Sequence, residues 1–437
     1  MLNIDFSSLQ TIDPRHGVSA DELQAGAAHL PEDHAAFLSR NQRFFEALDD
    51  DNALHAIKWA AADIRRCADH VFVLGIGGSA LGAKTIQQAL THPFANRLSA
   101  EQRNGPTVDI LDNVDPSVLH ALDDVADPQR RRMYVVISKS GMTPETMAQY
   151  FALEGEPPDR FVFVTDPKEG HLRALADRRG IPTLNYPEGV EGRFSVLTAS
   201  GLLPAAIMGV DINELVMGAK EERENALSLD PERNRSHRLA VIQHLLATRQ
   251  EAAKTMNVVM PYSGRLERFA AWFNQLQGES IGKRRNRAGQ DVHVGITPIQ
   301  ALGSTDEHSL VQLFRGGPND KLFLPIGVDN YQASLPIPRA SYPEDDIPDL
   351  DYLRGVTFED MMRVKTGALA RSLAEEDRPV IPMTVDRVDA RSLGALFALF
   401  EGSTAYLAER YGINGFDQPE VGRGKALTKE GLLALKQ

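Results

Sequence analysis

Residues 71–82 read VFVLGIGGSALG, an apolar run of strand length that leads directly into a glycine-rich turn ending at Ser79. Further apolar runs at 107–111, 134–138 and 160–165 each precede a turn and a stretch of helical composition. Nearly continuous apolar strands separated by helices are typical of a parallel sheet covered on both faces. The pattern returns later in MNVVMPYS (256–263), KLFLPIGV (321–328) and RPVIPMTV (378–385). The sequence therefore predicts an α/β fold with two sheet-containing units.

The chain has 437 residues, which exceeds the usual size of one domain. Residues 1–65 carry apolar residues at helical spacing, and we expect a helical lead-in there. We expect a first sheet domain over 66–230, a second over 231–400 and a C-terminal arm over 401–437.

The composition excludes several classes of protein. A formal net charge of −13 argues against nucleic-acid binding, which depends on clustered cations. No stretch approaches the roughly 18 apolar residues of a membrane span, and the N-terminus does not resemble a secretory signal. Cys67 is the single cysteine, so no intrachain disulfide can form. We expect a cytoplasmic protein that binds neither membranes nor nucleic acid.

Two charged segments are expected to be simple surface loops. KRRNR (283–287) lies between Gly282 and Gly289 and is interpreted as a solvated loop. SYPEDDIPDLDY (341–352) is acidic and rich in proline, but it lacks the ligand pattern of a calcium loop. The chain contains no HExxH motif either, and we predict no metal.

The opening turn is compatible with two kinds of ligand. Gly75, Gly77 and Ala80 fit the GxGxx(G/A) pattern of a dinucleotide-binding turn. That fold also needs an acidic residue about 20 positions further on, whereas the next predicted strand ends only near Asp112. A nicotinamide-dependent oxidoreductase is therefore kept as an alternative that depends on this turn alone.

A second turn, YVVISKSGMTPET (134–146), indicates a smaller anion. A buried run is followed at once by Ser138, Lys139, Ser140 and Thr143, at the predicted start of a helix. Free backbone N–H groups, the helix dipole, hydroxyls and one ammonium together form an anion cradle. The carboxyl ends of neighbouring parallel strands lie side by side, so Ser79 can face the same anion. We predict a pocket for a phosphate monoester.

Four further segments carry groups suited to catalysis. They are QLQGESIGK (275–283) with Glu279, EGRFSVLTASGLLP (191–204) with Arg193, GSTDEHSLVQL (303–313) with His308, and NGFDQPEVGRGK (414–425). Each of them alone fits an ordinary surface loop or helix cap.

Together and in this order, the six segments resemble the glucose-6-phosphate isomerase (phosphoglucose isomerase) family, in its shorter bacterial type. The resemblance runs from about residue 70 to residue 425. It implies two sugar-isomerase domains, each a parallel five-stranded sheet flanked by helices. It also implies interconversion of glucose 6-phosphate and fructose 6-phosphate through ring opening and an enediol intermediate, without a cofactor, in glycolysis and gluconeogenesis.

The resemblance assigns roles to individual residues. Glu279 is implied as the base between C1 and C2, Arg193 as the group that stabilises the enediolate, and His308 with Lys425 as the ring-opening groups. The implied substrate-binding residues are Gly78, Ser79, Ser138, Lys139, Ser140, Thr143, Gln275 and Gln418. The family also implies a homodimer in which each active site receives its histidine from the neighbouring subunit.

The chain departs from the family pattern at several positions. Glu420 and Gly422 stand where glycine and glutamate are usual, Glu191 replaces a glycine before Gly192-Arg193, and Met142 and Pro144 replace two threonines. Pro144 suits a first helical position, where a missing N–H costs little. A noncatalytic module that binds sugar phosphates is the main alternative, ahead of the oxidoreductase. It leaves Glu279, Arg193, His308 and Lys425 without a purpose.

Overall fold

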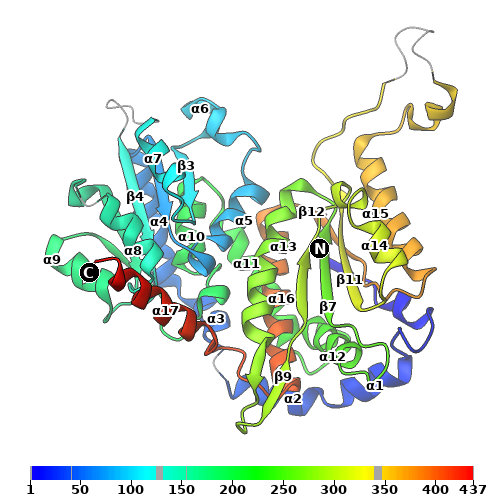
Figure 1. The fold of residues 1–437 in the computed structure, drawn as a ribbon. Helices are drawn as coiled ribbons and strands as arrows, with labels where there is room; N and C mark the ends of the chain where they lie inside the picture. The colour runs from blue at the N-terminus through cyan, green and yellow to red at the C-terminus, as the bar shows by residue number, and fades with distance from the viewer. Residues whose placement is uncertain (1, 41, 125–130, 154, 339–346, 437) are drawn as a thin grey trace.

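The computed structural model describes residues 2–40, 42–124, 131–153, 155–338 and 347–436. Two five-stranded sheets lie on opposite sides of a layer of helices (Figure 1). Among the described residues, no helix has the length and apolar character needed to cross a bilayer.

The first sheet has the strand order β3-β2-β4-β5-β6, and every neighbouring pair is parallel. Its strands are β2 (His70–Leu74), β3 (Thr107–Leu111), β4 (Arg132–Ile137), β5 (Phe161–Thr165) and β6 (Thr183–Asn185). Val71 and Val73 belong to the main core, whereas Phe72 and Leu74 face a separate cluster on the other side. Helices thus cover both faces, which explains why the strands are apolar throughout.

The main core side carries α4 (Asp51–Cys67), α5 (Leu81–Leu90) and α10 (Ala199–Ile207). The outer side carries α7 (Pro116–Asp124), α8 (Pro144–Ala152) and α9 (His171–Arg179).

The second sheet has the order β1-β12-β11-β7-β10. Its strands are β1 (Leu2–Ile4), β7 (Met256–Pro261), β10 (Thr297–Gln300), β11 (Lys321–Asn330) and β12 (Met383–Arg387). Its outer face packs against α14 (Val311–Gly316) and α15 (Phe358–Ala374). Its inner face packs against α12 (Arg235–Ala247), α13 (Glu267–Ile281) and α16 (Ala390–Arg410).

Helix α16 lies in the centre of the molecule and packs against α11 (Ile212–Ala226), α12 and α13. Phe397 and Phe400 make edge-to-face contacts with aromatic side chains of α13. The helix runs without a break through the boundary expected after residue 400.

The remaining elements are α1 (Ala20–Ala28), α2 (Leu30–Leu38), α3 (Arg43–Glu46), α6 (Ala100–Arg103), the hairpin of β8 (Lys283–Arg285) and β9 (Asp291–Val294), and α17 (Val421–Ala434).

The α/β fold class and the two five-stranded sheets agree with the sequence-based expectation. One strand differs, because β1 joins the second sheet antiparallel to β12, so the lead-in is not purely helical. The strand expected from residue 378 begins only at Met383. Pro379 and Pro382 precede it, and proline has no N–H to donate to a sheet.

The two charged segments differ in outcome. The KRRNR segment is not a solvated loop, because residues 283–285 form β8 and the Lys283 side chain is buried. In the second segment, residues 341–346 lie outside the described residues, and 348–353 form an exposed helical turn.

Candidate active site

The turn after β2 packs tightly against two other elements. Gly77 has φ +56°, and a side chain there would meet the amide of Gln275 on α13. A Cβ on Gly78 would lie 2.1 Å from the carbonyl group of Gly192. Both positions therefore require glycine, and the turn holds Ser79 just before α5.

The loop after β4 has the features of an anion cradle. Ser138 is buried, and its hydroxyl donates to Thr143 Oγ1 at 3.2 Å. The Thr143 side chain makes no capping bond to α8, whose first residue is Pro144. The first N–H groups of α8 are thus not satisfied by a side-chain cap and can meet an anion. Ser140 is exposed, and its Oγ accepts from the backbone N–H of Met142.

Lys139 forms an ion pair that the sequence did not predict. Its Nζ lies 2.9 Å from Oε1 of Glu191, the residue that departs from the family pattern. Glu191 directly precedes Gly192, which packs on Gly78. The pair therefore links the loop after β4 to the segment that carries Arg193.

Arg193 is 1% exposed and forms the centre of the site. Its Nε donates to Ser280 Oγ at 2.7 Å, and its Nη1 donates to Gln418 Oε1 at 2.6 Å and to Glu279 Oε2 at 3.3 Å. Its Nη2 donates to the carbonyls of Gly415 and Asp417. Burial lowers the pKa of Arg193, but nearby Glu279 opposes this effect. The charge is retained because arginine starts from a very high pKa.

Glu279 lies in the last turn of α13. Its side chain is 35% exposed, so solvent or a ligand can reach it. Its Oε1 accepts from Gln275 Nε2 at 3.1 Å, while Oε2 faces Arg193. Two donors from fixed elements hold the carboxylate in one orientation, as a base that must face a small ligand requires.

Lys283 belongs to this site, although the sequence did not predict it there. Its Nζ donates to the carbonyl oxygens of Glu279 at 2.6 Å and Ser280 at 3.1 Å. Burial, followed by the positive charge of Arg193, lowers the pKa of Lys283 to about 8. Lys283 is the last residue of the GESIGK segment, which could have indicated its place beside Glu279. The arginines that follow it led instead to the prediction of a solvated loop.

We expect Lys283→Met to lower turnover at least about tenfold, because the last turn of α13 would lose the group that fixes it. Two carbonyls would lose their donor, at a cost of about 2–4 kcal/mol in the free energy of unfolding. The folded-state pKa lies below the ordinary 10.5, so in wild type this group adds stability as pH rises from about 8 towards 10.5. Urea denaturation at pH 7 and pH 9 checks this, with Arg284→Met as the exposed control. A variant with wild-type turnover would contradict the positioning role.

The structure does not join His308 or Lys425 to this group of residues. Ala301 and Gly303 donate to carbonyls of β7, so His308 follows the carboxyl end of the parallel strands and is exposed. Glu279 lies at the opposite end, because α13 returns from the carboxyl end of β7. Lys425 lies on α17, which has no buried residue, and no hydrogen bond or ion pair joins its ammonium to another described residue.

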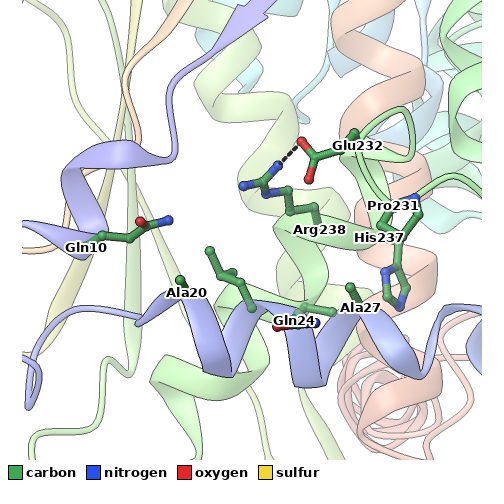
Figure 2. A pocket seen from close by; sticks show the side chains of 10 residues that line it. Gln10, Ala20, Gln24, Ala27, Pro231, Glu232, His237 and Arg238 are labelled. Carbon is green, nitrogen blue, oxygen red and sulfur yellow. Dashed lines mark hydrogen bonds and ion pairs between the residues drawn. The ribbon is translucent and has the colours of Figure 1, made fainter.

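A separate pocket of about 370 Å³ lies between α1 and the start of α12. Figure 2 shows that Gln24 and Ala27 of α1 form one wall, opposite the ion pair of Arg238 with Glu232. None of the predicted site residues lines this pocket.

Comparison with known proteins gives a consistent result. The family model described as phosphoglucose isomerase matches residues 36–326. A glucose-6-phosphate isomerase of Carboxydothermus hydrogenoformans is 40% identical over 85% of this chain and 80% of its own length. One of Rubrobacter xylanophilus is 36% identical over 98% of each chain.

Solved structures agree with this result. A hypothetical protein of Thermus thermophilus has a TM-score of 0.87 at 32% identity, covering 99% of this chain and 100% of that one. A glucose-6-phosphate isomerase of Chlamydia trachomatis shares the fold, with a TM-score of 0.74 at 22% identity over 89% of this chain and 74% of that one. The chain belongs to the phosphoglucose isomerase family.

Proposed function

We propose that this protein interconverts glucose 6-phosphate and fructose 6-phosphate by proton transfer between C1 and C2. The observation that carries the proposal is the placement of Arg193 beside Glu279, on a segment that packs directly against the Gly77–Ser79 turn. A carboxylate base, a fixed positive charge and an anion-binding turn are thereby part of one site. The membership of the family supports the same reaction.

The phosphate end of the sugar is held by the first sheet. Ser79, Ser138, Ser140 and Thr143 supply hydroxyls, and the starts of α5 and α8 supply N–H groups. The Gly78 backbone approaches the same anion. The ammonium of Lys139 either leaves Glu191 to bind the phosphate or contacts both groups at once.

Glu279 removes the proton from C2 and returns it to C1, through a cis-enediolate. Arg193 stabilises the charge that develops on the enediolate oxygens and remains protonated next to the base. Gln275 and Gln418 orient the sugar hydroxyls, since both already contact the catalytic pair. All groups for the transfer come from the chain itself, and the proposal includes neither a cofactor nor a metal.

Ring opening is assigned to His308 and Lys425. Histidine exchanges protons near neutral pH and suits the step that moves a proton to the ring oxygen. Within one chain His308 and Glu279 lie at opposite ends of the second sheet, so we infer that His308 reaches the site of a second copy. Exposed apolar side chains support such a dimer, and they include Leu335, Tyr352, Phe358, Leu427 and Leu432.

A mixing experiment tests the shared site. Glu279→Gln and His308→Ala homodimers are each expected to be nearly inactive. After subunit exchange, each mixed dimer has one intact site, so about a quarter of wild-type activity should return in an equimolar mixture. Sedimentation checks that dimers form. A mixture as inactive as its components would show that both residues act within one chain.

The activity itself is tested by supplying fructose 6-phosphate and detecting glucose 6-phosphate with a coupled dehydrogenase. We further propose that the protein acts in glycolysis and gluconeogenesis, in the cytoplasm. The division into a lead-in (1–65), two sugar-isomerase domains (66–230 and 231–400) and an arm (401–437) is likewise our proposal.

A nicotinamide cofactor would be revealed by saturable enhancement of NADH fluorescence, which we do not expect.

A further inference from the structure

The two sheets repeat one arrangement of strands. In the first sheet β2 occupies the second place, with β3 at the edge and β4 and β5 on its other side. In the second sheet β7 occupies the second place, with β10 at the edge and β11 and β12 on its other side. β2 leads through the Gly77–Ser79 turn into α5, and β7 leads through the Gly264–Leu266 turn into α13. The two strand-turn-helix units therefore correspond.

Helices α5 and α13 pack against each other between the sheets, and each turn contacts the other unit's helix. At the candidate active site, Gln275 of α13 lies against the turn at Gly77. At the other end, Gln88 of α5 accepts from the backbone N–H of Arg268 at 2.8 Å and donates to Glu267 at 3.0 Å. The second end is thus the structural counterpart of the active site.

A cavity of about 740 Å³ lies at this second end, and we call it the Arg265 pocket. The cations that line it are Lys84, Arg97, Arg265 and Arg268. Lys84 is paired with Asp112 at 2.6 Å. Asp109 is the one carboxylate among the lining residues, and it already contacts His70 and Asn96. Cations therefore outnumber acids here, although the whole chain carries a net charge of −13.

Two of these arginines have unused hydrogen-bonding capacity. Arg265 Nε is shielded from solvent and has no acceptor among the described residues, and its Nη1 meets Gln332 only at 3.4 Å. No hydrogen bond or ion pair joins the Arg268 side chain to another described residue. Arg265 is half-buried, so its Nε donor without an acceptor is costly, and a bound anion would satisfy it. Arg268 is exposed, and its side chain is free to contact the same anion.

We propose that the Arg265 pocket binds the phosphate group of a small phosphate monoester, as a second site apart from the active site. Guanidinium groups present paired N–H donors that match phosphate oxygens. The correspondence of the two ends rests on the proposed phosphate role of the Gly77–Ser79 turn, whereas the cluster of cations is independent of it.

The test uses inorganic phosphate as the probe, in calorimetric titration of the whole protein at low ionic strength. We expect two phosphates per chain. The double variant Arg265→Ala/Arg268→Ala should weaken one of them at least tenfold and leave turnover within twofold of wild type. Arg284→Ala/Arg285→Ala removes the same charge from two exposed arginines and should leave both phosphates bound.

Ser138→Ala/Lys139→Ala should weaken the other phosphate and impair catalysis. One phosphate per chain in the wild type, or two that the Arg265/Arg268 variant leaves unchanged, would overturn the inference. If the alanine variant does not fold, Arg265→Gln/Arg268→Gln keeps polar donors without charge and must still lose the affinity. If the wild-type protein had no isomerase activity but the Arg265/Arg268 variants still lost one bound phosphate, the proposed function would be refuted. The present inference would then still stand.

Discussion

Glu279→Gln is expected to lose at least about 10²-fold, and up to about 10⁴-fold, in kcat, because it removes the proposed proton acceptor. Glutamine has nearly the shape of glutamate, and its amide oxygen can still accept from Arg193. Gln275 can turn its own amide so that its oxygen, which has no partner in the wild type, accepts from the new NH₂ group. The substrate should therefore still bind, with KM changed only a few-fold. The coupled assay from fructose 6-phosphate measures both constants.

The matched control is Glu267→Gln, at the first residue of the same helix α13. Glu267 lies at the opposite end of the helix from Glu279, and its removal should leave kcat near the wild-type value. Circular dichroism melts verify that both variants are folded. Equal turnover in Glu279→Gln and the wild type would show that the base is another residue.

Arg193→Lys is expected to have the second large effect. Lysine keeps the charge but cannot reproduce a planar fork that meets Ser280, Glu279, Gln418 and two carbonyls. Loss of a preorganised donor at the enediolate should raise the barrier by about 3–4 kcal/mol, or 10²–10³-fold in kcat. Buried acceptors left unpaired should also lower the free energy of unfolding by about 2–4 kcal/mol.

The control for this variant is Arg284→Lys, a matched exchange on the exposed hairpin. It should change neither turnover nor the midpoint of urea unfolding. A lysine at position 193 that supported wild-type turnover would show that charge alone suffices, and that the fork has no catalytic role.

Much of the fold could be predicted, because buried parallel strands produce long apolar runs. β3 and β7 lie within the expected segments, since each is apolar over most of its length. β1, β6 and β10 were missed, because each has only three or four residues and so carries no periodic signal. Their pairing depends on the neighbouring strands and not on local sequence.

The candidate site was predicted residue by residue only in part. Arg193, Glu279, Gln275 and Gln418 do meet, although they come from three distant segments. The pairing of Lys139 with Glu191 could not be predicted, since it depends on two loops that approach each other only in the folded chain. Placement of His308 and Lys425 relative to Glu279 stays a prediction.

The antiparallel strand β1 has a consequence for the order of folding. Leu2 pairs with Val385, so the β1 segment leaves the ribosome long before its partner strand has been made. Contacts between such distant positions carry a large loop-closure entropy and form late. The first sheet contains only residues 70–185 and can assemble while the ribosome is still translating. Until β12 emerges, the unpaired β1 segment must be kept from pairing with another polypeptide.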